Sequence, residues 1–145
     1  MIGTHFIKAW SKTQATRALS SAEAELYAIV KATAEGMGVQ SILKDFGRKA
    51  KVHLMADASA ALGIVRRKGL GRMRHLDTDL LWVQDAHEGK KVGFHKITGT
   101  QNPADLLTKY LSAGEVEKHV KKLYIGYPTS HDDQNLTIHE LCIGI

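Results

Sequence analysis

The stretch that decides the fold is VHLMADASAALGIV, residues 52–65. Its first five residues form a short apolar run bounded by charge, a pattern typical of a buried strand. We expect this strand to end at Asp57 and a short helix to run from about Ser59 to Val65. Because strands and helical segments also alternate on both sides of this stretch, the sequence predicts an α/β protein.

Upstream, a longer helix is predicted to open at Ser20 or Ser21. Ser20 with Glu23 three positions later has the spacing of a capping box, in which each residue satisfies a free backbone N–H group of the other. Gly36 and Gly38 weaken the helix, and we therefore expect a second helical piece from Val39 to Phe46 that ends at Gly47.

The remaining elements follow from the same signals. Asn102 before Pro103 marks a helix start, and Ser112 with Glu115 is a second capping box. We expect strands at Phe6–Lys12 and Val92–Ile97 and helices at about Leu76–His87 and Ser112–Leu123.

The length of the chain is that of one globular domain, and its positive net charge favours an anionic partner. The chain has 145 residues, 43% of them hydrophobic and 24% charged, with a net charge of +5. All Lys and Arg residues fall within residues 1–124, which we take as the domain, whereas residues 125–145 form an acidic tail of uncertain structure. The single cysteine, Cys142, excludes an internal disulfide, and with no secretory signal or membrane span in the sequence we expect an intracellular protein.

Three carboxylates stand at positions where α/β proteins gather their functional groups. Glu25 lies in the first helix, Asp57 ends the central strand, and Asp105 opens a late helix. Each also has a structural interpretation, since Glu25 suits a helix N-terminus, Asp57 can cap the next helix, and Asp105 complements a helix dipole.

A resemblance to a known family is carried by several separated strings. The chain resembles the RNase H domain that ends the polyprotein of copia-type LTR retrotransposons, over about residues 1–111. The strings are Trp10–Gln14, Ala18–Ala28, Asp57–Ala61, Arg74–Asp77 and Asn102–Lys109, and they occur in the order and spacing of that domain.

The resemblance implies a fold, a reaction and a site. The fold would be an RNase H-like mixed sheet flanked by helices, and the reaction would be hydrolysis of the RNA strand of an RNA/DNA hybrid. By position, Glu25, Asp57 and Asp105 match the carboxylates that hold two Mg²⁺ (or Mn²⁺) ions in such a site. The implied partners are the hybrid and the reverse transcriptase part of the same polyprotein, in a cytoplasmic particle or the nucleus.

The chain departs from the family at its first strand. The family pattern needs a fourth carboxylate on that strand, and no acidic residue precedes Glu23. The resemblance implies that the first strand and most of the second are missing, and that Met1 is an internal methionine of a longer reading frame. We therefore expect this chain alone to fold poorly or to be catalytically weak.

A basic cluster is the candidate nucleic-acid contact. Arg and Lys contacts to phosphate give affinity without sequence specificity. Its members are Arg66, Arg67, Lys68, Arg72 and Arg74, with His75 as a further substrate contact. A solvated loop is the alternative interpretation of the cluster.

Other chemistry-bearing residues receive structural interpretations. Trp10, Trp82 and Tyr27 are expected in the core rather than as stacking platforms for bases. His139 and Cys142 have metal-ligand spacing, but no second ligand pair stands nearby in the sequence.

Two alternatives to a hydrolase remain open. The chain could be a degenerate, non-catalytic relic that binds nucleic acid, with Glu25, Asp57 and Asp105 serving only as caps and surface charge. It could also be a protein–protein module whose sheet edge pairs with a strand from a separate chain.

Overall fold

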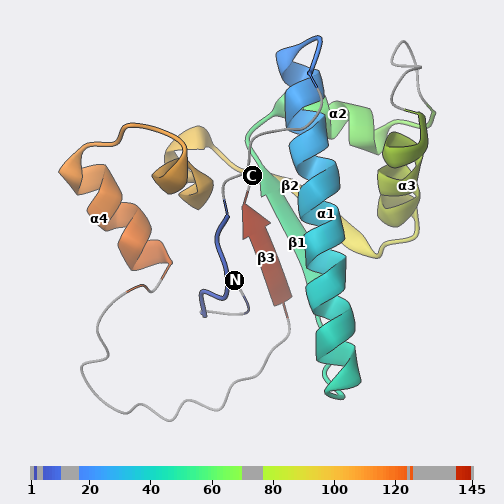
Figure 1. Ribbon diagram of the computed structural model, residues 1–145, viewed down its shortest axis with the longest axis horizontal. Coiled ribbons are helices and arrows are strands. Elements are labelled where there is room, and N and C mark those ends of the chain that lie inside the picture. Colours follow the sequence, from blue (N-terminus) through green and yellow to red (C-terminus); the bar gives the residue numbers. More distant parts are fainter. Residues whose placement is uncertain are drawn as a thin grey trace.

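The computed structural model describes residues 2, 5–10, 17–69, 77–123, 125 and 140–144. Helices and strands alternate along the chain, which confirms the α/β class (Figure 1). In order, the elements are α1 (Ser21–Asp45), β1 (Lys51–Ala56), α2 (Ser59–Arg66), α3 (Asp77–Glu88), β2 (Val92–Lys96), the 3-10 helices η2 (Gly99–Gln101) and η3 (Pro103–Leu107), α4 (Ala113–Lys122) and β3 (Glu140–Gly144).

Within the described residues, three strands form one parallel sheet in the order β2-β1-β3. Leu54 in the central strand pairs with Phe94 in β2 and with Ile143 in β3. Val52, Leu54 and Ala56 are buried and alternate with less buried residues, which is the period of a strand with one face on a core. The prediction of a buried strand within residues 52–65 is confirmed.

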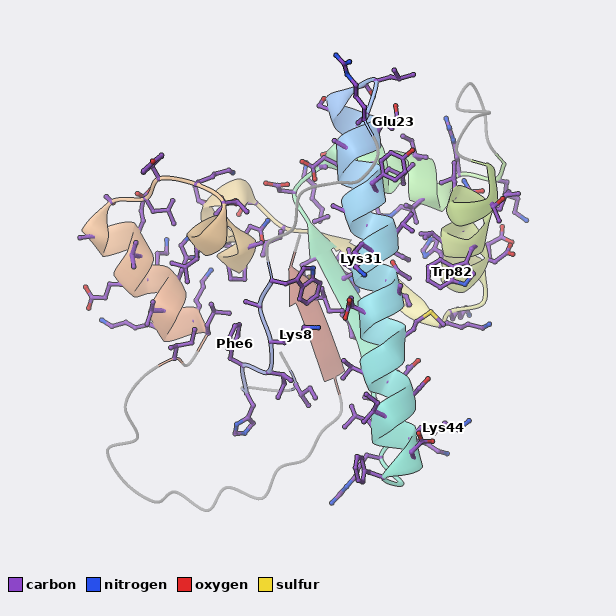
Figure 2. The ribbon with its side chains drawn as sticks, viewed as in Figure 1. Phe6, Lys8, Glu23, Lys31, Lys44 and Trp82 are labelled. Atoms are coloured by element: carbon purple, nitrogen blue, oxygen red, sulfur yellow. The ribbon has the colours of Figure 1, made fainter. Side chains whose placement is uncertain are left out.

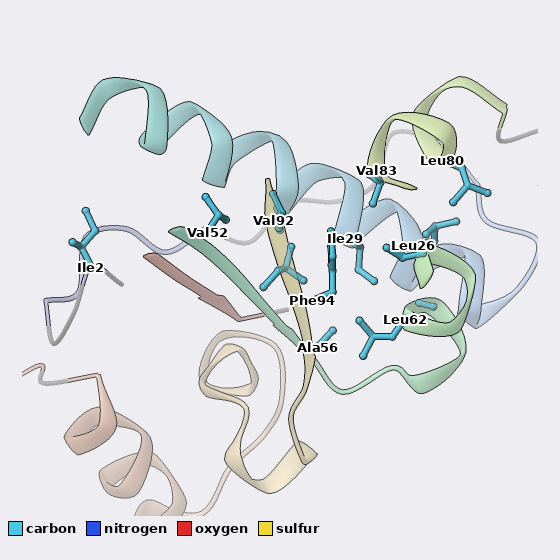
Figure 3. Close-up of a cluster of buried hydrophobic side chains, with 14 residues drawn as sticks. Ile2, Leu26, Ile29, Val52, Ala56, Leu62, Leu80, Val83, Val92 and Phe94 are labelled. Carbon is cyan, nitrogen blue, oxygen red and sulfur yellow. The ribbon is translucent and has the colours of Figure 1, made fainter. Parts of the chain in front are cut away.

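The core lies between one face of the sheet and three helices. Helices α1, α2 and α3 pack against one another and against the strands, whereas α4 lies apart beside η3 (Figure 1). Figure 3 shows the apolar side chains that meet there. The largest of them are Ile2, Leu26, Ile29, Val52, Leu54, Leu62, Val65, Leu80, Val83, Val92 and Phe94.

The start of α1 is capped from both directions. The Glu23 backbone N–H donates to Ser20 Oγ at 3.2 Å, and the Glu23 carboxylate accepts from the backbone N–H of Leu19 at 2.9 Å. Glu23 is only 2% exposed, so its charge is balanced by hydrogen bonds rather than by water. The predicted N-terminus of this helix is confirmed.

The predicted break within α1 is wrong. The helix runs unbroken through Gly36 and Gly38 to Asp45, so Val39–Phe46 is not a separate piece. A Cβ on Gly36 would stand 2.5 Å from Ile143 Cδ1 and 2.8 Å from Val52 Cγ1. Gly36 is therefore a point at which the helix backbone approaches the sheet closely, and packing outweighs its low helix propensity.

One further local expectation is wrong. Residues 6–10 form no strand, although Ile2 and His5 make an isolated antiparallel bridge. The helix start predicted at Asn102 and Pro103 is confirmed, and the helix is of the 3-10 type over Pro103–Leu107. At its end the backbone N–H groups of Thr108 and Lys109 donate to the carbonyl of Asp105.

The two tryptophans lie at the surface and not in the core. Trp10 and Trp82 are each 38% exposed, whereas Tyr27 is partly buried against the core as expected. Lys8, two residues from Trp10, lies 5.3 Å from its ring centroid and pairs with Glu35 of α1 at 3.3 Å (Figure 2).

The last strand belongs to the sheet. Within residues 125–145, whose structure the sequence leaves uncertain, Glu140–Gly144 forms β3 and pairs in parallel with β1. Ile143 reaches into the core, and a Cβ on Gly144 would lie 3.1 Å from Asn102 Oδ1. This strand occupies an edge of β1 that would otherwise be open.

Among the described residues, no helix combines the length and apolar character needed to cross a membrane.

Candidate active site and nucleic-acid interface

Asp57 stands at the carboxyl end of the central strand. It follows Ala56, where β1 ends and the chain bends toward α2. The 3-10 helix η2 approaches it, because a Cβ on Gly99 would lie 3.6 Å from Asp57 Oδ2. The side chain is half-buried, and its position at a parallel strand end is where α/β sheets place their ligands.

Glu25 comes to the same place from the second turn of α1. Burial raises the pKa of Glu25 above its ordinary value, the negative charge of Asp57 raises this pKa further, and the positive charge of Lys109 partly offsets both effects. Two carboxylates that are distant in the sequence therefore repel each other across this end of the sheet.

Asp105 is held in place by its local turn. Asn102 Oδ1 accepts a hydrogen bond from the backbone N–H of Ala104 at 3.2 Å, and Asn102 is only 2% exposed. This cap fixes the start of η3, which places Asp105 in its first turn with 9% of its surface exposed. The predicted capping role of Asn102 is confirmed.

Lys109 pairs with Asp105 and lies within the electrostatic reach of the other two carboxylates, a role that the sequence did not reveal. Its Nζ lies 2.9 Å from Asp105 Oδ1 and 3.0 Å from Asp105 Oδ2. The hydrogen bond and the charge of Asp105 raise the pKa of Lys109 above its ordinary value, and Asp57 and Glu25 add to this. The i, i+4 spacing of Asp105 and Lys109 was the available signal.

The carboxylates do not form a ready-made metal cage. Within the described part of the chain, no three His, Cys, Asp or Glu side chains are grouped closely enough to hold an ion. Lys109 instead supplies the positive charge that faces this cluster, which we call the acidic site and define as Glu25, Asp57 and Asp105.

The basic cluster is only partly described. Arg66 donates from Nη2 to the carbonyl of Phe94 at 2.9 Å, and Lys68 pairs with Glu88 at 3.1 Å. Arg66, Arg67 and Lys68 are all exposed. Arg72, Arg74 and His75 lie outside the described residues.

Two further cations lie at the carboxyl edge of the sheet. Lys96, the last residue of β2, donates to Ser59 Oγ at the start of α2. Lys122 of α4 donates to the carbonyl of Gln101 at 3.4 Å. The sequence signal for Lys96 was its place at the end of a parallel strand, one strand over from Asp57.

The raised pKa of Glu25 predicts a change in stability with pH. Because folding raises the pKa of Glu25, the ionised side chain destabilises the folded state at pH 7. This destabilisation disappears as the pH falls below the ordinary pKa of 4.5, where the side chain is protonated in both states. Glu25→Gln should therefore stabilise the chain at pH 7 by about 0.5 kcal/mol, a value discounted for solvent screening, with no gain near pH 4.

Urea unfolding at both pH values measures this difference. Glu35→Gln is the matched control on the same helix, because a hydrogen bond from Lys31 lowers the pKa of Glu35. Loss of the Glu35 charge should therefore destabilise the folded chain at pH 7. A Glu25→Gln variant that is less stable than the parent chain at pH 7 would contradict the repulsion.

The geometry defines an α/β chain with a small parallel sheet flanked by helices and carboxylates gathered at one end of its central strand. Its sequence is similar to the retrovirus-related Pol polyprotein from transposon TNT 1-94 of Nicotiana tabacum, with 28% identity over 109 residues. The match covers 74% of this chain and 8% of that polyprotein. No protein-family profile and no solved structure matches the chain. The resemblance to a retrotransposon is thereby supported at the level of the Pol polyprotein.

Proposed function

We propose that this chain is an RNase H-like part of a copia-type retrotransposon Pol polyprotein, with an acidic site for Mg²⁺- or Mn²⁺-dependent hydrolysis of the RNA strand of RNA/DNA hybrids. The proposal places it beside the reverse transcriptase part of that polyprotein, in a cytoplasmic particle or the nucleus. We further propose that this chain alone is a weak catalyst.

One observation carries the proposal. Glu25, Asp57 and Asp105 come from three segments that are far apart in the sequence. The negative charge of each raises the pKa of Lys109. Carboxylates that only cap helices or carry surface charge need not lie near one lysine, whereas the ligands of a cation must lie close together.

The chemistry of the donors fits a hard divalent ion. Mg²⁺ prefers carboxylate oxygens, and bound ions would activate water and stabilise the charge that develops at phosphorus. Glu25, Asp57 and Asp105 would hold the ions, and the raised pKa of Glu25 reflects crowding of negative charge that such ions would relieve. Lys109 must release Asp105 before that carboxylate can take part.

Cations around the acidic site suit a nucleic-acid backbone. Lys96 and Lys122 flank the carboxyl edge of the sheet, and Arg66, Arg67 and Lys68 continue from the end of α2. Phosphate contacts of this kind bind by charge and shape, which is what recognition of a hybrid without sequence preference needs.

Cleavage of a labelled RNA/DNA hybrid tests the proposal. The chain should cleave the RNA strand in Mg²⁺ or Mn²⁺ and stop when the ions are chelated. Asp57→Asn should lower the rate by at least about a hundredfold, because the metal-bound charge supplies several kcal/mol of transition-state stabilisation.

Asp85→Asn is the matched control, because Asp85 is an exposed residue of α3 away from the acidic site. Its rate should equal that of the parent chain, and circular dichroism of both variants checks the fold. Equal cleavage by the parent chain and Asp57→Asn would remove the acidic site from the mechanism.

A second function has an observation in its favour. Asp105 is already paired with Lys109, and within the described residues no three His, Cys, Asp or Glu side chains are grouped closely enough to hold an ion. A non-catalytic module that binds hybrids through its cations would show binding with steep salt dependence and no cleavage in either metal.

A further inference from the structure

A buried amide on α3 holds both ends of the segment that carries the described cations of the basic cluster. Gln84 is only 5% exposed, and its helix packs beside α2 (Figure 1). Its Nε2 donates to the carbonyl of Ile64 at 2.9 Å and to the carbonyl of Gly69 at 3.2 Å. Its Oε1 accepts from the backbone N–H of Gly69 at 3.2 Å. The chain between these contacts, residues 65–68, is therefore fixed from both sides.

The backbone groups that Gln84 contacts are those that regular secondary structure leaves unsatisfied. Ile64 lies in the last turn of α2, where carbonyl groups have no partner within the helix. Gly69 has a φ of +78°, a left-handed conformation that suits glycine, and it belongs to no helix or strand. A carboxamide can donate to two carbonyls and accept from an N–H group at the same time. An apolar side chain at position 84 would leave these backbone groups without this partner, which is costly in a partly buried place.

The cations of this segment are exposed, although the backbone beneath them is held in place. They are Arg66, Arg67 and Lys68. Arg66 Nη2 donates to the carbonyl of Phe94 in β2 at 2.9 Å. Lys68 Nζ lies 3.1 Å from Oε1 of Glu88 in α3. An ion pair between two such exposed side chains is weak, so a phosphate group can replace Glu88 as the partner of Lys68.

We propose that Gln84 is a positioning residue for nucleic-acid binding, which holds the cations of residues 66–68 in the arrangement that a phosphate backbone meets. This role rests on the proposed function, in which these cations contact the RNA/DNA hybrid. Fixing a backbone segment costs conformational entropy, and a segment that is already fixed in the free protein does not incur that cost on binding. Gln84 touches no phosphate itself, so its loss should act through the cations.

Binding of a labelled RNA/DNA hybrid to the full chain tests this role. Fluorescence anisotropy at low salt, with a chelator present so that no strand is cleaved, gives the dissociation constant. Gln84→Met keeps the length of the side chain but removes its hydrogen-bonding groups. It should weaken binding about tenfold, because the hybrid must then order the segment. Equal affinities of the parent chain and Gln84→Met would overturn the role.

A double-mutant cycle separates positioning from a general loss of stability. Arg67→Gln together with Lys68→Gln removes two of the cations that Gln84 positions. In that background Gln84→Met should change the affinity less than about threefold, since little is left for it to act through. An undiminished effect of Gln84→Met would show that Gln84 acts by another route, and it would overturn the role.

Gln40→Met is the matched control, because Gln40 of α1 also donates from Nε2 to a backbone carbonyl, that of Ala50 at 2.7 Å. Ala50 precedes β1 and lies at the opposite end of that strand from Asp57. This variant should bind the hybrid like the parent chain, and circular dichroism compares the folds of the two variants. Equal weakening by both substitutions would contradict a specific role for Gln84.

The proposed function and the positioning role fail in different ways. A parent chain that does not bind the hybrid would contradict the nucleic-acid contact itself, and the positioning role with it. A parent chain that binds, combined with a cycle that shows no coupling, would overturn only the role of Gln84.

Hydrogen exchange at the Gly69 amide gives a readout on the parent chain alone, which holds even where Gln84→Met does not fold. This amide should exchange slowly in the free chain, because it donates to Gln84 Oε1. Addition of the hybrid should then slow it little further. An amide that exchanges freely until the hybrid is added would show that the segment is ordered by binding, and this result would overturn the role.

Discussion

Replacing Gly36 with valine should destabilise the chain by about 2–3 kcal/mol. The added atoms would enter space already filled by Ile143 Cδ1 at 2.5 Å and Val52 Cγ1 at 2.8 Å. Both neighbours belong to the sheet, so either the helix must lift or β3 must leave, and overpacking of this kind is costly. Urea unfolding of Gly36→Val against the parent chain measures the loss.

Gly38 on the same helix is the matched control. Its Cβ would meet nothing within 4 Å, so Gly38→Ala should stabilise the chain by about 1 kcal/mol through helix propensity alone. Ile143→Ala combined with Gly36→Val should recover part of the loss, because it removes one of the two clashes. Purely additive effects of the two substitutions would contradict the docking of β3 against α1.

Truncating Leu54 to alanine should cost about 3–4 kcal/mol. Leu54 is fully buried in the central strand, between Phe94 and Ile143. Loss of its side chain removes transfer free energy and leaves a cavity that the two neighbouring strands hold open. Thermal or urea unfolding gives the difference directly.

Met55→Ala is the matched control for this substitution, since Met55 is the next residue of β1 on the opposite face and is only half-buried. It should cost about 1 kcal/mol, in proportion to the smaller apolar area removed from water. Equal losses for the two variants would mean that the core does not lie on the face described.

Short sequence patterns predicted a helix start or a strand correctly where all the interacting residues lie within the pattern itself. Ser20 with Glu23, Ser112 with Glu115 and the apolar run ending at Asp57 each contain the groups that define them. Both serines cap a helix, Glu115 completes the second capping box, and the apolar run forms β1. The carboxylate of Glu23 accepts from the backbone N–H of Leu19. The unbroken helix through Gly36 could not be foreseen in this way. It depends on contacts with Val52 and Ile143, which are distant in sequence.

The candidate site was predictable by residue type but not by arrangement. Glu25, Asp57 and Asp105 could be named from position and resemblance, yet spacing does not say that one lysine faces all three. Lys109 follows Asp105 by four residues, which suggests a simple helical pair, and only the folded chain adds the charges of the other two carboxylates.

The pairing of β3 with β1 also sets an order of events during synthesis. Lys51 pairs with Glu140, so the edge of β1 emerges from the ribosome 89 positions before its partner. At ordinary rates of translation this interval lasts roughly 5–20 seconds. Throughout it the backbone groups on this edge of β1 are open to strands of other nascent chains, so crowded polysomes should lose more of this protein to aggregation than dilute ones.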